Sequence, residues 1–60
     1  MNWNDIRRLA QKNGFRLVMH GKKHDIYRND KTGMTIQIER HWSQEIRPGL
    51  MHRLKKQIGF

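Results

Sequence analysis

The residues best suited to chemistry in this chain lie in one short basic stretch, residues 20–28, which reads HGKKHDIYR. A glycine, two lysines and two histidines stand together there, in a chain with few acidic residues. Histidine can accept and donate protons near neutral pH because its ordinary pKa is about 6.5. Lysine and arginine supply fixed positive charge where negative charge must be held. The stretch therefore fits two interpretations: a basic turn that binds nucleic acid, or a site where His24 transfers a proton.

RNA is a substrate that suits these residue types, because its 2′-hydroxyl supplies the nucleophile. A protein that cleaves RNA in this way needs only to move protons and to stabilise the charged phosphorane. The predicted topology places four basic residues near enough to one another to hold the phosphate: Lys22, Lys23, Arg28 and Arg40. His24 is then the proton-transfer group, a phosphate contact or simply an exposed histidine, and the residue types alone leave these three alternatives open.

A metal site is not predicted. The four histidines are scattered rather than spaced as ligands along one helix or knuckle, and they are His20, His24, His41 and His52. The five acidic residues are spread over five segments, so they offer no carboxylate cage for a two-metal nuclease. Without cysteine there is neither a disulfide nor a thiolate zinc site. We therefore expect no metal and no other cofactor.

Composition predicts one small domain over residues 1–60, with a strongly basic surface. A chain of 60 residues buries only about 60% of its unfolded surface, so its stability should be modest. Thirteen lysines and arginines against five acids give a net charge of +8, which favours nucleic acid or an acidic protein as partner. No apolar run approaches the length of a membrane span or the core of a signal peptide, so we expect a cytoplasmic protein with no membrane partner.

Two helices are predicted, one at each end of the chain. Residues 1–15 predict the first, with Asn2 or Asn4 as its N-cap and Gly14 as a left-handed stop. Its apolar stripe consists of Trp3, Ile6, Leu9 and Ala10. Pro48 opens the second helix, because the N–H that proline lacks has no partner at a helix start.

Three strands are predicted between the helices, over residues 15–20, 24–29 and 34–40. The residues that alternate onto one face are Phe15, Leu17 and Met19 in the first strand, and Met34, Ile36 and Ile38 in the third. Short turns join the strands, which implies an antiparallel meander. Because only one sheet face is rich in apolar side chains, both helices should pack on it. The expected fold is α+β, with the order α-β-β-β-α.

The register of the middle strand stays open. If Ile26 shares a face with Ile36, period two places His24 and Arg28 on the helix-covered side as well. A slip of one residue at the preceding turn reverses this and sends Tyr27 inward.

The same topology predicts where the strand ends meet. His20, His24 and Arg40 should share one edge of the sheet, and the N-termini of both helices should fall there too. Positive helix ends beside basic side chains would make a seat for a phosphate. Trp42, in the loop that follows, either stacks on a base or packs against the core.

Four ordered segments of the chain match a known pattern: NGF after the first helix, GKKHDIY, TGMTIQIERH and EIRPGLMHRLKKQIGF. Together they closely resemble the HicA family of bacterial toxins. The resemblance covers nearly the whole chain, from about Trp3 to Phe60. Its distinctive part is the Gly-x-x-His-x-x-aromatic stretch that begins at Gly21.

The resemblance implies a fold like that of double-stranded RNA-binding domains. It also implies a toxin that cleaves mRNA, halts translation and is held inactive by a HicB antitoxin encoded beside it. The family's catalytic histidine falls on His24, its glycine on Gly21, and its later histidine on His41, in a structural or supporting role. The chain departs from the pattern at Lys22, where a small hydroxyl residue is common, and at residues 39–41, where Glu-Arg-His replaces Pro-x-His.

The resulting prediction is a metal-independent endoribonuclease toxin in which His24 is the general acid or base. The residues expected at the RNA phosphates are Gly21, Lys22, Lys23, Arg28 and Arg40. The first alternative is a module that binds double-stranded RNA without cutting it, through phosphates and 2′-hydroxyls. The second is an interaction subunit whose charge serves only an acidic protein partner.

Overall fold

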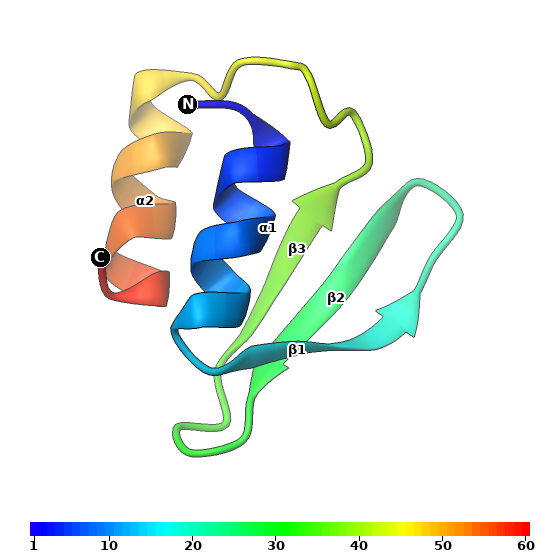
Figure 1. The fold of residues 1–60 in the computed structure, drawn as a ribbon, viewed down its shortest axis with the longest axis vertical. Coiled ribbons are helices and arrows are strands. Elements are labelled where there is room, and N and C mark those ends of the chain that lie inside the picture. Colours follow the sequence, from blue (N-terminus) through cyan, green and yellow to red (C-terminus); the bar gives the residue numbers. More distant parts are fainter.

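The computed structural model describes all 60 residues and contains two helices and three strands (Figure 1). Their order and bounds are α1 Trp3–Lys12, β1 Phe15–His20, β2 His24–Asn29, β3 Thr35–Glu39 and α2 Pro48–Ile58. The strands form one antiparallel sheet in the order β1-β2-β3, so β1 and β3 are its edges. The predicted α-β-β-β-α architecture is confirmed.

A core of ten buried apolar residues joins the helices to one face of the sheet. It consists of Trp3, Ile6, Ala10, Phe15, Tyr27, Ile36, Ile38, Ile46, Leu54 and Ile58. Residues come from both helices, from all three strands and from the loop before α2, so each element depends on the others for its burial. The opposite face of the sheet stays open.

The register of β2 follows the second of the two alternatives. Tyr27 pairs with Ile36 and Asp25 with Ile38, so these four side chains share the inner face. Tyr27 is only 3% exposed. The slip buries the large aromatic ring in place of Ile26, and aromatic side chains contribute most to small cores through their area. His24 therefore lies on the open face.

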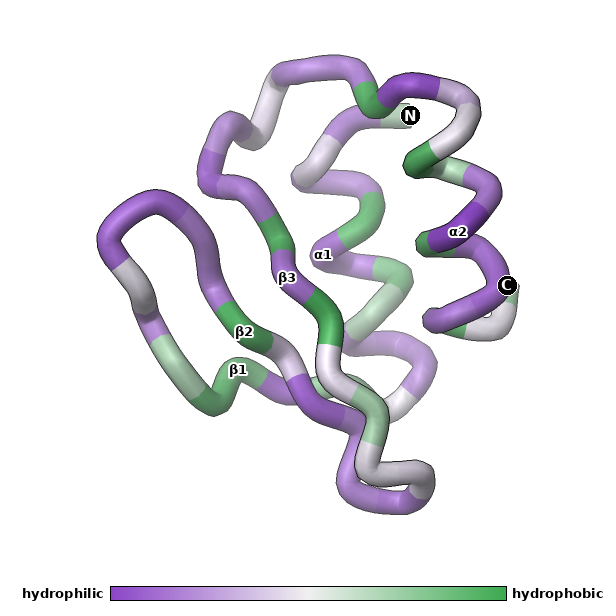
Figure 2. Tube along the Cα trace, turned by 180° about the vertical axis from the view of Figure 1, so that it is seen from behind, coloured by the Kyte–Doolittle hydropathy of each residue, from purple (hydrophilic) through white to green (hydrophobic).

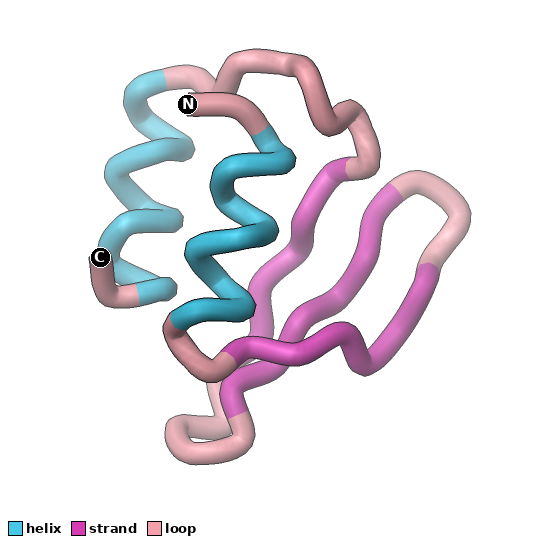
Figure 3. The backbone as a smooth tube through the Cα atoms, in the orientation of Figure 1, coloured by secondary structure: helices cyan, strands magenta, loops and turns pink.

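The strict alternation predicted for β1 is wrong. Leu17 pairs with Tyr27 and Met19 with Ile26, and the register shift between them leaves Val18 as the extra residue of a bulge. Met19 is therefore moved to the open face, where it is 62% exposed. His20, opposite Asp25, moves to the inner side. Beyond Phe15 no residue of β1 is buried, because the β1–β2 hairpin extends past the helices (Figures 1 and 3).

Both ends of α1 are built as its sequence indicates. The side chain of Asn2 accepts a hydrogen bond from the Asp5 N–H at 3.0 Å, and the Asp5 carboxylate accepts one from the Asn2 N–H at 3.1 Å. This capping box satisfies donors that would otherwise have no partner in the first turn. The chain leaves the helix through Gly14, whose φ of 92° is a conformation that favours glycine. The turn into β1 is thus fixed locally.

An exposed ion pair ties the start of β1 to the β2–β3 turn. Arg16 donates to the Asp30 carboxylate from Nε at 2.6 Å and from Nη2 at 3.3 Å. These hydrogen bonds, and the charge of Arg16, hold the pKa of Asp30 below its ordinary value of 3.8. A carboxyl with a lowered pKa stabilises the fold above its unfolded pKa, and this contribution is lost as pH falls through the folded pKa.

Asp30→Asn should therefore lower the melting temperature slightly at pH 7, because exposed ion pairs contribute little. The difference between the two proteins should begin to shrink as the pH falls below the ordinary carboxyl pKa of 3.8, and it should vanish once the pH lies below the lowered pKa of Asp30 in the folded protein. Thermal unfolding of both proteins at pH 7 and in steps down to about pH 2 measures this. A difference that did not change with pH would contradict the assignment.

Candidate functional site

Lys22 and Lys23 form a tight turn between β1 and β2. The N–H of Gly21 donates to the carbonyl of His24 at 3.0 Å, which closes the turn. A Cβ atom on Gly21 would lie 2.7 Å from that carbonyl oxygen, closer than a side chain can approach. Both lysine side chains are exposed, and most of the turn between β1 and β2 is hydrophilic (Figure 2). The glycine of the motif is therefore required by the close approach of two backbone segments.

Gly21→Ala should destabilise the chain by about 1–3 kcal/mol, because the new Cβ forces the backbone apart. Gly49→Ala is the matched control. Gly49 lies in α2, and a Cβ atom at this position would meet no atom within 4 Å, so this variant should not lose stability. Chemical denaturation of both variants measures the difference. Equal stability of the two would show that the turn tolerates a side chain.

A buried carboxylate lies directly behind the turn. Asp25 is 5% exposed, and its Oδ1 accepts a hydrogen bond from Arg40 Nη1 at 2.6 Å. Arg40 Nη2 also donates to the carbonyl of Lys22. A buried charge needs a partner of this kind, since an unpaired one is strongly disfavoured. Arg40 thus fastens the turn to the end of β3, which confirms the predicted meeting of the strand ends.

His20 completes this cluster. Its Nδ1 lies 2.8 Å from Asp25 Oδ1 and 3.2 Å from Arg40 Nη1. Nδ1 therefore lies within contact distance of both members of the Asp25–Arg40 pair. The imidazole is oriented by this contact while its side chain remains 67% exposed. His20 and Asp25 are the pair of residues that lie opposite each other on β1 and β2 next to the turn.

His24 itself lies on the other side of the sheet. It pairs with Glu39 and is partly exposed on the open face, and no side-chain hydrogen bond fixes its imidazole. Arg28 shares that face but stands four residues further along β2, about 13 Å away at the rise of a strand. Its Nε lies 3.6 Å from Asp30 Oδ1. The structure therefore brings Lys22, Lys23 and His24 together and leaves Arg28 apart.

The N-termini of the two helices were predicted to lie beside the β1–β2 turn, and they do not. At α1, the Trp3 and Asn4 N–H groups donate to the carbonyls of Gln44 and Trp42, at 3.3 and 3.1 Å. These donors are consumed by the loop and cannot bind a phosphate. The start of α2 lies on the far side of that loop from the hairpin (Figure 1). The expectation of a phosphate seat built from two helix ends was wrong.

Of the two alternatives for Trp42, stacking on a base or packing against the core, the structure shows packing. Its ring lies partly buried against the core, with the Arg7 guanidinium 5.0 Å from the ring centroid. His41 is exposed beside it, and its carbonyl accepts a hydrogen bond from the Gln44 N–H at 2.9 Å. The loop after β3 thus has a structural role, and His41 belongs to it.

Sequence reasoning did not identify the Asp25–Arg40 pair or the contact of His20 with it. One signal was present: if Gly21 pairs with His24, the next pair outward must be His20 with Asp25. Nowhere in the structure do three histidine or acidic side chains gather as metal ligands would. Neither helix has the length and apolar character needed to span a membrane.

The fold and the site together describe a small basic α+β protein that presents an exposed, lysine-rich hairpin turn with a histidine at its end. The family described as the HicA toxin of bacterial toxin-antitoxin systems matches residues 3–60. The chain belongs to this HicA toxin family. Searches of curated proteins and of solved structures give no significant match to it.

Proposed function

We propose that this toxin is a metal-independent endoribonuclease that cleaves mRNA and so inhibits translation, and that it acts in the cytoplasm. One observation carries the proposal: a glycine-closed turn, fastened by Arg40, presents two lysines and His24 at one exposed end of the sheet. Family membership supports the toxin role. The proposed phosphate ligands are Lys22 and Lys23, with Arg40 acting mainly through the turn that it holds.

The proposed reaction is transfer to the 2′-hydroxyl. The 2′-oxygen attacks the adjacent phosphorus and the bond from phosphorus to the 5′-oxygen breaks. One proton leaves the 2′-hydroxyl and one reaches the 5′-oxygen, and His24 carries one of these transfers as general base or general acid. The lysines stabilise the negative charge that grows on the phosphorane. The products are a 2′,3′-cyclic phosphate and a 5′-hydroxyl end.

RNA cleavage by the purified chain in EDTA tests this directly. We expect cleavage to persist, because no step uses a metal, and end-group analysis should find cyclic phosphates with 5′-hydroxyl ends. A denatured sample of the same preparation controls for contaminating ribonucleases that refold readily. Products carrying only 5′-phosphates would contradict the reaction as written.

A second candidate is a module that binds double-stranded RNA without cutting it. It is favoured by the α-β-β-β-α order and by the absence of a hydrogen bond that orients His24. Such a module would lose affinity gradually as lysines were removed, with the salt slope falling by about one for each phosphate contact.

The proposed protein partner is an antitoxin of the HicB type. A toxin of a toxin–antitoxin system requires such an inhibitor, and a net charge of +8 favours an acidic one.

A further inference from the structure

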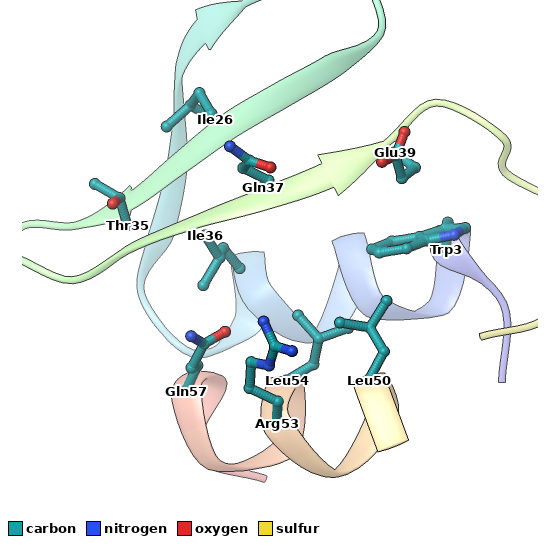
Figure 4. Close-up of a pocket in the computed structure, with 10 residues that line it drawn as sticks. All are labelled: Trp3, Ile26, Thr35, Ile36, Gln37, Glu39, Leu50, Arg53, Leu54 and Gln57. Atoms are coloured by element: carbon teal, nitrogen blue, oxygen red, sulfur yellow. The ribbon is translucent and has the colours of Figure 1, made fainter. Parts of the chain in front are cut away.

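A groove runs along the outer edge of β3, between that strand and α2 (Figure 4). Its volume is about 360 Å³. Thr35, Gln37 and Glu39 line it from the strand, and Leu50 and Leu54 from the helix. A neighbouring hollow of about 430 Å³ shares Glu39 and Leu50 with it and carries the depression on toward the loop before α2.

The strand wall of this groove exposes unpaired backbone groups. The N–H of Asn29 donates to the carbonyl of Met34 at 2.9 Å, so this residue pair is hydrogen-bonded across the β2–β3 ladder. In an antiparallel ladder such pairs alternate, which turns the backbone groups of Ile36 and Ile38 toward β2 as well. The N–H and C=O groups of the alternate residues, Thr35, Gln37 and Glu39, therefore point away from β2, toward solvent. All three of those residues line the groove, together with Ile36 of the same strand.

The other edge of the sheet is not built in the same way. β1 carries a bulge between Leu17 and Met19, which breaks the regular spacing of donors and acceptors. β3 pairs without any shift over its whole length. A continuous strand can add only to an edge with regular spacing, so β3 is the edge suited to it.

We propose that the β3 groove binds an extended strand of an acidic partner protein, which extends the sheet by strand addition. Alternating donors and acceptors on β3 match a polypeptide backbone and not a nucleic acid. The apolar floor, which includes the rim of Trp3 and Leu54, accepts an apolar side chain at every second residue of the strand.

Charge decides what kind of strand the groove takes. The charged residues that line the groove are Arg53 of α2 and Glu39 of β3, so the groove itself carries no net charge. Lys55 and Lys56 lie elsewhere on α2, and the net charge of +8 on the whole chain is what favours an acidic strand. A second copy of this chain would bring another +8 against it, so self-association is disfavoured. An acidic strand with alternating apolar residues is the complementary occupant. The partner that the toxin role supplies is the antitoxin, so this inference rests on that role and is independent of RNA cleavage.

The test uses the intact complex of this chain with its proposed partner, a HicB-type antitoxin. We expect the amide hydrogens of Thr35, Gln37 and Glu39 to exchange much more slowly in the complex than in the free chain. Gln37→Pro removes one outward N–H without touching the β2 ladder, a place where strands tolerate proline. It should weaken antitoxin binding by about tenfold or more, since a backbone hydrogen bond is lost and the ring crowds the added strand.

Gln37→Thr is the matched control, because it changes the same side chain and keeps the N–H, and it should bind the antitoxin as the wild type does. Binding with unchanged exchange at the three amides would overturn the proposal, as would equal binding of the proline and threonine variants. Slow exchange that arose from dimerisation of this chain alone would overturn the assigned occupant. RNA cleavage by the free Gln37→Pro variant should equal that of wild type, so a failure of the enzymatic proposal remains separate from a failure of this one.

Discussion

Replacement of His24 by alanine is expected to reduce RNA cleavage by about 10²–10⁴-fold while RNA affinity stays within about threefold. The rate falls because a general acid or base is lost, and positioned proton transfer contributes this much to such reactions. Affinity is retained because Lys22 and Lys23, which make the electrostatic contacts, stay on an unchanged turn. Single-turnover cleavage and a filter-binding assay at one salt concentration measure the two effects separately.

His52→Ala is the matched control for this experiment. His52 is an exposed histidine of α2, so its removal deletes the same side chain at a distance from the turn. The control should cleave RNA at the wild-type rate. If the wild type and the His24 variant both bound RNA and neither cut it, the lysines would be the purpose of the turn, and the binding module would replace the enzyme as the better account.

The second large effect is expected on stability. Asp25→Ala should lower the free energy of unfolding by about 3–5 kcal/mol, because Arg40 is left partly buried without its counter-charge. Domains have only about 5–15 kcal/mol in total, so this loss is a large fraction of the free energy of unfolding of a 60-residue chain. Urea denaturation followed by circular dichroism measures the loss.

Asp30→Ala provides the comparison, since it removes an exposed acidic residue from an ion pair of similar length. Its effect should stay within about 1 kcal/mol. A double variant, Asp25→Leu with Arg40→Met, should recover most of the lost stability, because removing both charges together leaves neither one buried alone. Equal effects of Asp25→Ala and Asp30→Ala would show that the buried pair is not what holds the turn.

The order of elements could be predicted because each boundary is signalled locally. Asn2 and Asp5 form a capping box within four residues, Gly14 ends α1, and Pro48 begins α2. None of these signals depends on residues far along the chain. The alternation of Ile36 and Ile38 likewise identified the inner face of β3 without any knowledge of its neighbours.

The register of β2 could not be predicted in the same way. Both alternatives place one apolar residue inside, either Ile26 or Tyr27, so the period of two does not distinguish between them. The choice depends on the bulge at Val18 and on the space available beneath α1, and both are properties of the assembled sheet. For this reason the sequence alone does not determine on which face of the sheet His24 lies.

The same limit applies to the candidate site. The glycine, the lysines and His24 lie within four residues, so their association is visible in the sequence. Asp25 and Arg40 are fifteen residues apart, and an acidic residue in a strand usually indicates the solvent side. Only the register shows that Asp25 is buried and that Arg40, predicted as a phosphate ligand, is engaged in holding it.

The contact between the loop before α2 and the start of α1 has a consequence for how the protein opens. In an isolated helix the first turn frays, because its N–H groups have no partner. Here the N–H groups of Trp3 and Asn4 are bonded to loop carbonyls about forty residues away in sequence. The first turn cannot fray unless the loop departs with it, so the two behave as one cooperative unit. The loop before α2 has no regular secondary structure, yet it should open as rarely as the first turn of α1 does.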